Sequence, residues 1–265
     1  MNSRAFDGAG MVAGNWQMIA VWDLPTRVFH WSLVLSFAGA YITGEVERWG
    51  TLHALLGYVL LLLIGFRLVW GVIGSRYARF SAFVTAPVAV LRYLGSLLGG
   101  RPEHHVGHNP AGAMAIVLLL ALGLMVAVTG LATLKGIGGE WVEDIHEAAA
   151  QAMLAVVAIH VAGVLVSSVL HRENLVRAML TGRKHGHPAE GLASMHRLLG
   201  IALLLGLVAL GAVWATGSTA RLPGLGDVEQ LDREWQEEGR GEARERDGED
   251  DGRRRGRGRG ERDDD

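Results

Sequence analysis

Five long apolar stretches constrain the fold of this chain more than any other feature of its sequence. They approach or exceed the roughly 20 residues that a helix needs to cross a bilayer, and half of the 265 residues are hydrophobic. A soluble chain of this length would rarely carry so many. We therefore expect an all-α membrane protein, with a four-helix transmembrane bundle and a fifth transmembrane helix. The expected spans are residues 26–43, 52–73, 111–129, 143–169 and 196–215.

Proline and glycine residues mark the expected ends of these helices. Pro25 and Pro110 suit a first helical turn, because the N–H that proline lacks is not needed there. Gly44 and Gly130 suit helix ends, where a residue in the left-handed conformation often closes the last turn. Residues 87–98 combine apolar side chains with Arg92, which predicts a short helix lying at the membrane surface.

The basic residues between the stretches predict the orientation of the chain. If the N-terminus is cytoplasmic, basic residues gather on the cytoplasmic side, which is the positive-inside pattern. The cytoplasmic set is Arg4, Arg27, Arg67, Arg76, Arg79, Arg92, Arg101, Arg172, Arg177, Arg183, Lys184 and Arg197. Before the tail, the opposite side receives only Arg48 and Lys135. The loops on that opposite side are acidic.

The composition changes completely from about residue 217. Residues 221–265 hold 11 basic and 16 acidic residues and almost no apolar ones, so this segment cannot bury a core and is expected to stay disordered. The sequence thus predicts four parts: a cytoplasmic N-terminal segment (1–21), a four-helix domain (22–185), a fifth transmembrane helix (186–216) and a disordered charged tail (217–265). With five spans, the tail would lie outside the cytoplasm.

The chain contains no cysteine, which excludes several kinds of redox centre. Disulfides, iron–sulfur clusters held by thiolates and covalently attached c-type haem all require cysteine. A metal centre must therefore use histidine, methionine or oxygen ligands. With 11 histidines in an apolar chain, non-covalent haem is the first expectation.

Two histidines share one face of one apolar stretch. His146 and His160 are fourteen residues apart, which is close to four helical turns and about 21 Å along the axis. His160 has apolar neighbours in the sequence AVVAIHVAGVLV. An ionisable side chain in such a stretch needs a partner from another helix or a metal.

His30 and His53 complete a set of four that sorts by depth. In the expected topology His30 and His160 lie toward the cytoplasmic face, and His53 and His146 lie toward the other face. Each pair could supply both axial ligands of a six-coordinate haem b, which favours electron transfer because no open position remains. Each histidine taken alone could equally be an interfacial or hydrogen-bonded residue.

Other polar residues are weaker candidates. Arg27 and Arg67 could bind haem propionates near the membrane surface, or could be anchors that reach lipid headgroups. Gly39, Gly57, Gly123 and Gly163 fall within helices and could make room for a flat cofactor or for close helix contact. Solvated loop positions are expected for His104, His105, His108, His185 and His187. His171 and His196 flank helices at the cytoplasmic face, where a structural role is preferred to contact with a haem propionate or a place in a quinone pocket.

Several spaced motifs resemble the bacterial cytochrome b561 family, which includes the b-type subunits of nickel–iron hydrogenases. The motifs are VWDLPTRVFHW, LHALLGYVLLLLIGFRLVWG, GHNPAGA, EDIHE and HVAGVLVSSVLHRENLVRAMLTGRK, and they cover about residues 21–184. The resemblance implies a four-helix bundle with two non-covalent haems b. Their ligands, one each from the first two helices and two from the fourth, would be His30, His53, His146 and His160. The fifth helix and the tail depart from the shortest members.

These features lead to one main functional hypothesis and two alternatives. The main hypothesis is a di-haem cytochrome b of the bacterial inner membrane that transfers electrons in a respiratory chain between the quinone pool and a redox partner. The partner would be a c-type cytochrome, a hydrogenase or a dehydrogenase. A superoxide:quinone oxidoreductase is one alternative, but the acidic outer loops would repel superoxide. A histidine-lined transporter is the other, but the spans carry almost no further polar residues.

Overall fold

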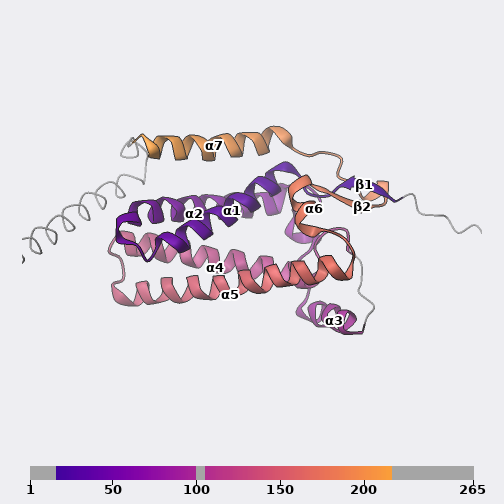
Figure 1. Cartoon of the computed structure of the whole chain (residues 1–265), viewed down its shortest axis with the longest axis horizontal. Coiled ribbons are helices and arrows are strands. Elements are labelled where there is room, and N and C mark those ends of the chain that lie inside the picture. Colours follow the sequence, from indigo (N-terminus) through magenta and orange to yellow (C-terminus); the bar gives the residue numbers. More distant parts are fainter. Residues whose placement is uncertain (1–15, 100–104, 217–265) are drawn as a thin grey trace, which may run out of the picture. The chain divides into compact units, whose positions relative to one another are not determined.

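A computed structural model describes residues 16–99 and 105–216 of the chain (Figure 1). The expected N-terminal segment is therefore described only from residue 16, and the charged tail lies outside the described residues. The element order is β1 (Gln17–Ala20), α1 (Leu24–Thr43), the 3-10 turn η1 (Glu47–Trp49), α2 (Gly50–Ile73), η2 (Phe80–Ala82), α3 (Pro87–Leu98), α4 (Pro110–Leu134), α5 (Glu140–Leu170), α6 (Leu175–Thr181), β2 (Arg183–Gly186), η3 (Pro188–Glu190) and α7 (Arg197–Ala215).

The all-α membrane fold expected from the sequence is confirmed. Among the described residues, α2, α4, α5 and α7 are long and apolar enough to cross a membrane, so the chain is a multi-pass membrane protein. Helix α1 has the necessary 20 residues but is not in this group, because Thr26, Arg27 and His30 lower the hydropathy of its first turns.

The end of α4 differs from the sequence expectation. Gly130 was expected to close this helix, but α4 continues to Leu134, and Gly130 has an ordinary helical conformation. The glycines with positive φ are Gly136, Gly138 and Gly139 in the loop that follows, where a left-handed backbone turns the chain toward α5. The role of Gly130 lies in tertiary packing and is described below.

The described residues form two compact units, each of which draws segments from several helices. The described residues of unit 1 are 16–31, 65–99, 105–121 and 152–204. Those of unit 2 are 32–64, 122–151 and 205–216. His30 and His160 therefore fall in unit 1, and His53 and His146 fall in unit 2.

Unit 1 contains a small sheet that the sequence analysis did not find. Strand β1 pairs with β2 in antiparallel register, with Gln17 opposite Gly186 and Ala20 opposite Arg183. Ile19, Val21, Trp22 and Ala178 form an apolar cluster beside the sheet. Strands of four residues carry too short an alternation to be recognised, and their partner is more than 160 positions away.

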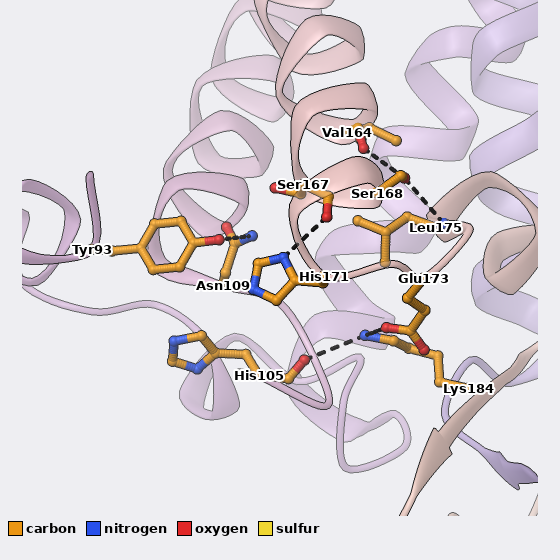
Figure 2. Close-up of polar contacts among 10 residues, drawn as sticks. All are labelled: Tyr93, His105, Asn109, Val164, Ser167, Ser168, His171, Glu173, Leu175 and Lys184. Atoms are coloured by element: carbon orange, nitrogen blue, oxygen red, sulfur yellow. Dashed lines mark hydrogen bonds and ion pairs between the residues drawn. The ribbon is translucent and has the colours of Figure 1, made fainter. Parts of the chain in front are cut away.

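A buried ion pair joins strand β2 to the segment directly after α5. Lys184 Nζ lies 3.0 Å from Glu173 Oε2, and the two side chains are 4% and 15% exposed. The same ammonium donates to the carbonyl oxygen of His105 at 3.3 Å, as Figure 2 shows. Nearby, Asn109 donates from Nδ2 to the Tyr93 hydroxyl and accepts from Gly112 N, which caps the start of α4.

Unit 2 is held together by apolar contacts between α1, α2, α4 and α7. Leu55 of α2 is buried among Leu52, Ala54, Tyr58, Leu134, Leu210 and Trp214. Gly39 of α1 faces Leu56 so closely that a Cβ atom there would lie 2.8 Å from Leu56 Cδ1. Close helix contact therefore explains Gly39, one of the glycines whose role the sequence left open.

Candidate functional site

Two histidine side chains face one another in unit 2. The ring centroids of His53, on α2, and His146, on α5, are 6.1 Å apart and the ring planes meet at 76°. Both residues are half-buried. The two imidazoles come from different helices, as a pair of axial ligands must.

Each of these rings forms a hydrogen bond to a backbone carbonyl of another helix, α1 for His53 and α4 for His146. His53 Nδ1 donates to the carbonyl oxygen of Ala40 at 2.9 Å, and His146 Nδ1 donates to that of Val126 at 2.9 Å. A carbonyl oxygen only accepts hydrogen bonds, so Nδ1 must carry the proton in both rings. The Nε2 lone pair of each ring is then available to a metal, which is the usual arrangement of metal-binding histidine.

Small residues define where these two rings lie. A Cβ atom on Gly130 would stand 2.8 Å from Cε1 and 3.1 Å from Nδ1 of His146, and one on Gly44 would stand 3.3 Å from His53 Cε1. Glycine at 130 is thus required by the His146 ring. By contrast, nothing lies within 4 Å of a Cβ placed at Gly57, one turn from His53 on α2.

The separation of the rings fits a shared metal ion. A metal–imidazole bond of about 2.0–2.1 Å, as measured for zinc, on both sides of one ion puts the ring centroids about 6 Å apart. The described residues contain no group of three or more histidine, aspartate or glutamate side chains suited to holding a metal ion. Two imidazoles alone suit a metal whose remaining ligands come from a macrocycle such as porphyrin.

His30 and His160 are the corresponding histidines of unit 1. They come from α1 and α5 and lie close enough for their charges to interact. His30 Nδ1 is buried and has no hydrogen-bond partner among the described residues. It therefore lacks the carbonyl partner that both unit 2 histidines have, and the structure describes no direct contact between the two rings.

The two arginines singled out in the sequence lie beside a buried carboxylate in unit 1. Arg67 is 3% exposed and Asp23 is fully buried, and Asp23 interacts electrostatically with both Arg27 and Arg67. The carboxylate accepts hydrogen bonds from Thr26 N at 2.9 Å and from Trp70 Nε1 at 3.2 Å. Arg27 Nε and Arg67 Nη1 are buried without a hydrogen-bond partner in the described residues.

This group carries more positive than negative charge. One carboxylate faces two guanidinium groups, and a buried charge without compensation is expensive. The arrangement is suited to receiving a further anionic group. Sequence reasoning missed Asp23, although its place two residues before Pro25 was visible in the VWDLP motif.

The position of His108 differs from the one that the sequence predicts. It was expected to be solvated, but its ring packs between Trp22 and Phe83, with centroid distances of 4.5 and 4.7 Å. Its Nδ1 nitrogen is buried without a partner among the described residues. Burial, followed by the charges of Arg67, Lys184, His160 and His30, lowers the pKa of His108 to about 3, so the ring is neutral near pH 7.

A cavity of about 490 Å³ opens beside His108 in unit 1. It is lined by Trp16, Arg76, Tyr77, Ala82, Phe83, His105, Val106, Gly107, His108, His187 and Glu190. The Tyr77 hydroxyl donates to the Glu190 carbonyl oxygen at 2.8 Å. Burial raises the pKa of Tyr77, which keeps the phenol protonated. The cavity therefore combines aromatic walls with hydrogen-bonding groups.

Comparison with known proteins agrees with the motifs noted in the sequence. The family model described as prokaryotic cytochrome b561 matches residues 21–182. The chain is similar to a probable Ni/Fe-hydrogenase B-type cytochrome subunit of Rhizobium leguminosarum bv. viciae, with 24% identity over 68% of this chain and 94% of that protein.

Two further relatives carry the same description. The protein of Azotobacter chroococcum mcd 1 is 26% identical over 62% of this chain and 87% of its own length. The Ni/Fe-hydrogenase 1 B-type cytochrome subunit of Escherichia coli (strain K12), also described as probable, is 26% identical over 42% of this chain and 58% of its own length. No solved structure gives a significant match.

Proposed function

Because the chain belongs to the prokaryotic cytochrome b561 family, we propose that this membrane cytochrome b holds two haems b and transfers electrons between the quinone pool and a redox partner. One haem site uses His53 and His146 in unit 2, and the other uses His30 and His160 in unit 1. The observation that carries the proposal is the facing pair of imidazoles in unit 2, with centroids 6.1 Å apart.

The protein side chains set the chemistry of each site. Haem b supplies a one-electron iron centre within the membrane. Two imidazoles would hold the iron at each site, and a fully ligated iron would be suited to electron transfer and not to oxygen binding. In unit 2 the carbonyl groups of Ala40 and Val126 fix the ring orientation and raise the basicity of the ligating nitrogens.

The positive groups of unit 1 support a second site. Arg27 and Arg67 would bind propionate oxygens through the nitrogens that lack partners, and a charge-assisted hydrogen bond is the strong type of such contact. Asp23 keeps the two guanidinium groups together without neutralising both. A propionate would supply the missing compensation for the buried Arg67 charge.

The unit 1 cavity is the proposed place of quinone exchange. Its size and its aromatic and polar lining suit a flat ring with two carbonyl acceptors, and His108 belongs to its wall. An Ala82→Trp substitution would fill the cavity, and we expect slower quinone reduction with an unchanged haem spectrum. An unchanged rate would place the quinone elsewhere.

The redox partner and the orientation are parts of the same proposal. The relatives are described as hydrogenase subunits, so a hydrogenase is one partner class; a c-type cytochrome or a dehydrogenase would meet the same electron-transfer role. The excess of basic residues in loops expected on one side supports a bacterial inner-membrane protein with a cytoplasmic N-terminus and a periplasmic C-terminus.

Haem stoichiometry tests the proposal directly. We expect the purified full-length protein to contain two haems b per chain by pyridine haemochrome assay, with a low-spin spectrum. His53→Ala and His160→Ala should each lose one haem, and each should leave the haem of the other unit in place. The control is His185→Ala, which removes an exposed histidine of β2. A colourless protein, or an unchanged haem content in His160→Ala, would refute the proposal.

A further inference from the structure

His108 has a buried nitrogen with no partner in residues 16–99 and 105–216, and basic groups lie around it. The ring is held between Trp22 and Phe83, while Nδ1 is inaccessible to solvent and unpaired among the described residues. Buried imidazole nitrogens are ordinarily hydrogen-bonded, because an unmet hydrogen bond in the interior destabilises the fold. The nitrogen therefore points to a group that the described residues do not supply.

The groups around His108 indicate the charge of that missing partner. Those that interact with it electrostatically are Arg67, Lys184, His160 and His30, and all of them are basic. Lys184 is already paired with Glu173, whereas Arg67 Nη1 has no hydrogen-bond partner in the part of the chain that the structure describes. The partner of this cluster should thus be an acceptor that carries negative charge.

His108 and Arg67 both lie against the ring of Phe83. Its ring centroid is 4.7 Å from that of His108 and 5.7 Å from Arg67 Cζ, and Phe83 is 4% exposed. The guanidinium and the imidazole thus pack on the same buried aromatic ring. A single carboxylate, or two carboxylates of one ligand, could meet both donors.

We propose that His108 is a positioning residue of the unit 1 haem site, and that its Nδ1–H donates a hydrogen bond to a haem propionate held also by Arg67. This inference rests on the proposed function, since it requires a haem between His30 and His160. A cavity-bound quinone is a poorer partner for Nδ1, because the cavity admits water and Nδ1 is buried. The His108 hydrogen bond disperses propionate charge near the iron and so favours the reduced haem.

Two substitutions at one position separate hydrogen bonding from packing. His108→Phe keeps an aromatic ring between Trp22 and Phe83 but removes the nitrogen. His108→Asn loses ring packing but returns an N–H close to the position of Nδ1. The control is His185→Gln, which changes an exposed histidine of β2 that does not line the cavity.

The measurement is a spectroscopic redox titration of both haems in the purified full-length protein. We expect His108→Phe to lower the midpoint potential of the unit 1 haem by up to about 59 mV. For a one-electron couple, this shift is a tenfold change in the equilibrium between oxidised and reduced haem. His108→Asn should recover most of that change, while the unit 2 haem of each variant and both haems of the His185→Gln protein should keep the parent potentials. A redox-induced infrared difference spectrum, with haem labelled by ¹³C at the propionates, should show a carboxylate band that shifts in His108→Phe.

The possible failures are distinguishable. If the unsubstituted protein holds fewer than two haems, the proposed function is wrong. If it holds two haems and His108→Phe moves neither the potential nor the propionate band, the assignment of His108 is overturned. An equal downward shift in His108→Phe and His108→Asn would also overturn it, since packing rather than hydrogen bonding would then set the potential. Should His108→Phe fail to fold, a His108→Asn protein with the parent propionate band supports the assignment and a shifted band opposes it.

Discussion

Replacing Gly130 by alanine places a methyl group against the ring of His146. The added Cβ would lie 2.8 Å from Cε1 and 3.1 Å from Nδ1, whereas carbon atoms in contact prefer about 3.5–4.0 Å. The ring must therefore retreat by roughly 0.7–1.2 Å, because the obstacle is a backbone-anchored atom of α4.

This displacement breaks the hydrogen bond that orients the ligand. The His146 Nδ1 to Val126 O distance is 2.9 Å, and lengthening it by the same amount takes it to or beyond the limit of about 3.5 Å for a hydrogen bond. Loss of such an orienting contact typically lowers metal affinity about 10- to 100-fold. We expect a loss of that order at the unit 2 haem site of Gly130→Ala.

Haemin titration of the apoprotein, followed by the spectrum of each haem, measures the effect. The unit 1 haem should bind as in the parent. Gly211→Ala is the matched control, because it is the same substitution within α7 of unit 2, and nothing lies within 4 Å of its Cβ. Parent-like affinity at the unit 2 site in Gly130→Ala would refute the reasoning, as would an equal loss in Gly211→Ala.

Three further predictions concern unit 1. Arg67→Met should lower the midpoint potential of the unit 1 haem by tens of millivolts, where about 59 mV corresponds to a tenfold change in the reduction equilibrium. A redox titration showing no shift would argue against a propionate at Arg67. Lys184→Met should lower unfolding stability by about 3–5 kcal/mol, because Glu173 is left as an uncompensated buried charge; thermal unfolding in detergent should show recovery in a Lys184→Met/Glu173→Leu double variant, and no recovery would contradict the ion-pair account. Asn109→Ala should cost about 0.5–2 kcal/mol through loss of the α4 cap, with Asn109→Ser retaining most of the stability in the same assay.

The candidate site was only partly accessible to sequence reasoning. The four histidines stood out because ionisable residues are rare in apolar stretches, and their pairing followed from their expected depths. The family match supports the resemblance that implied the same four residues. His108 was misjudged as solvated, since a loop position near polar residues gives no sign of burial. Its packing depends on Trp22 and Phe83, which are distant in the sequence.

The sequence by itself determined the helices and the family. Apolar length specifies spanning segments because the bilayer thickness is fixed, and Pro110 marked the start of α4 where the structure has it. Only the tertiary structure decided what individual residues do: that Gly130 makes room for the His146 ring, that the Ala40 and Val126 carbonyls fix which imidazole nitrogen is free, and that β1 pairs with β2. The physical reason is the separation along the sequence of the residues that interact. Helix formation depends on neighbours within a few turns, whereas these contacts join residues that only folding brings together.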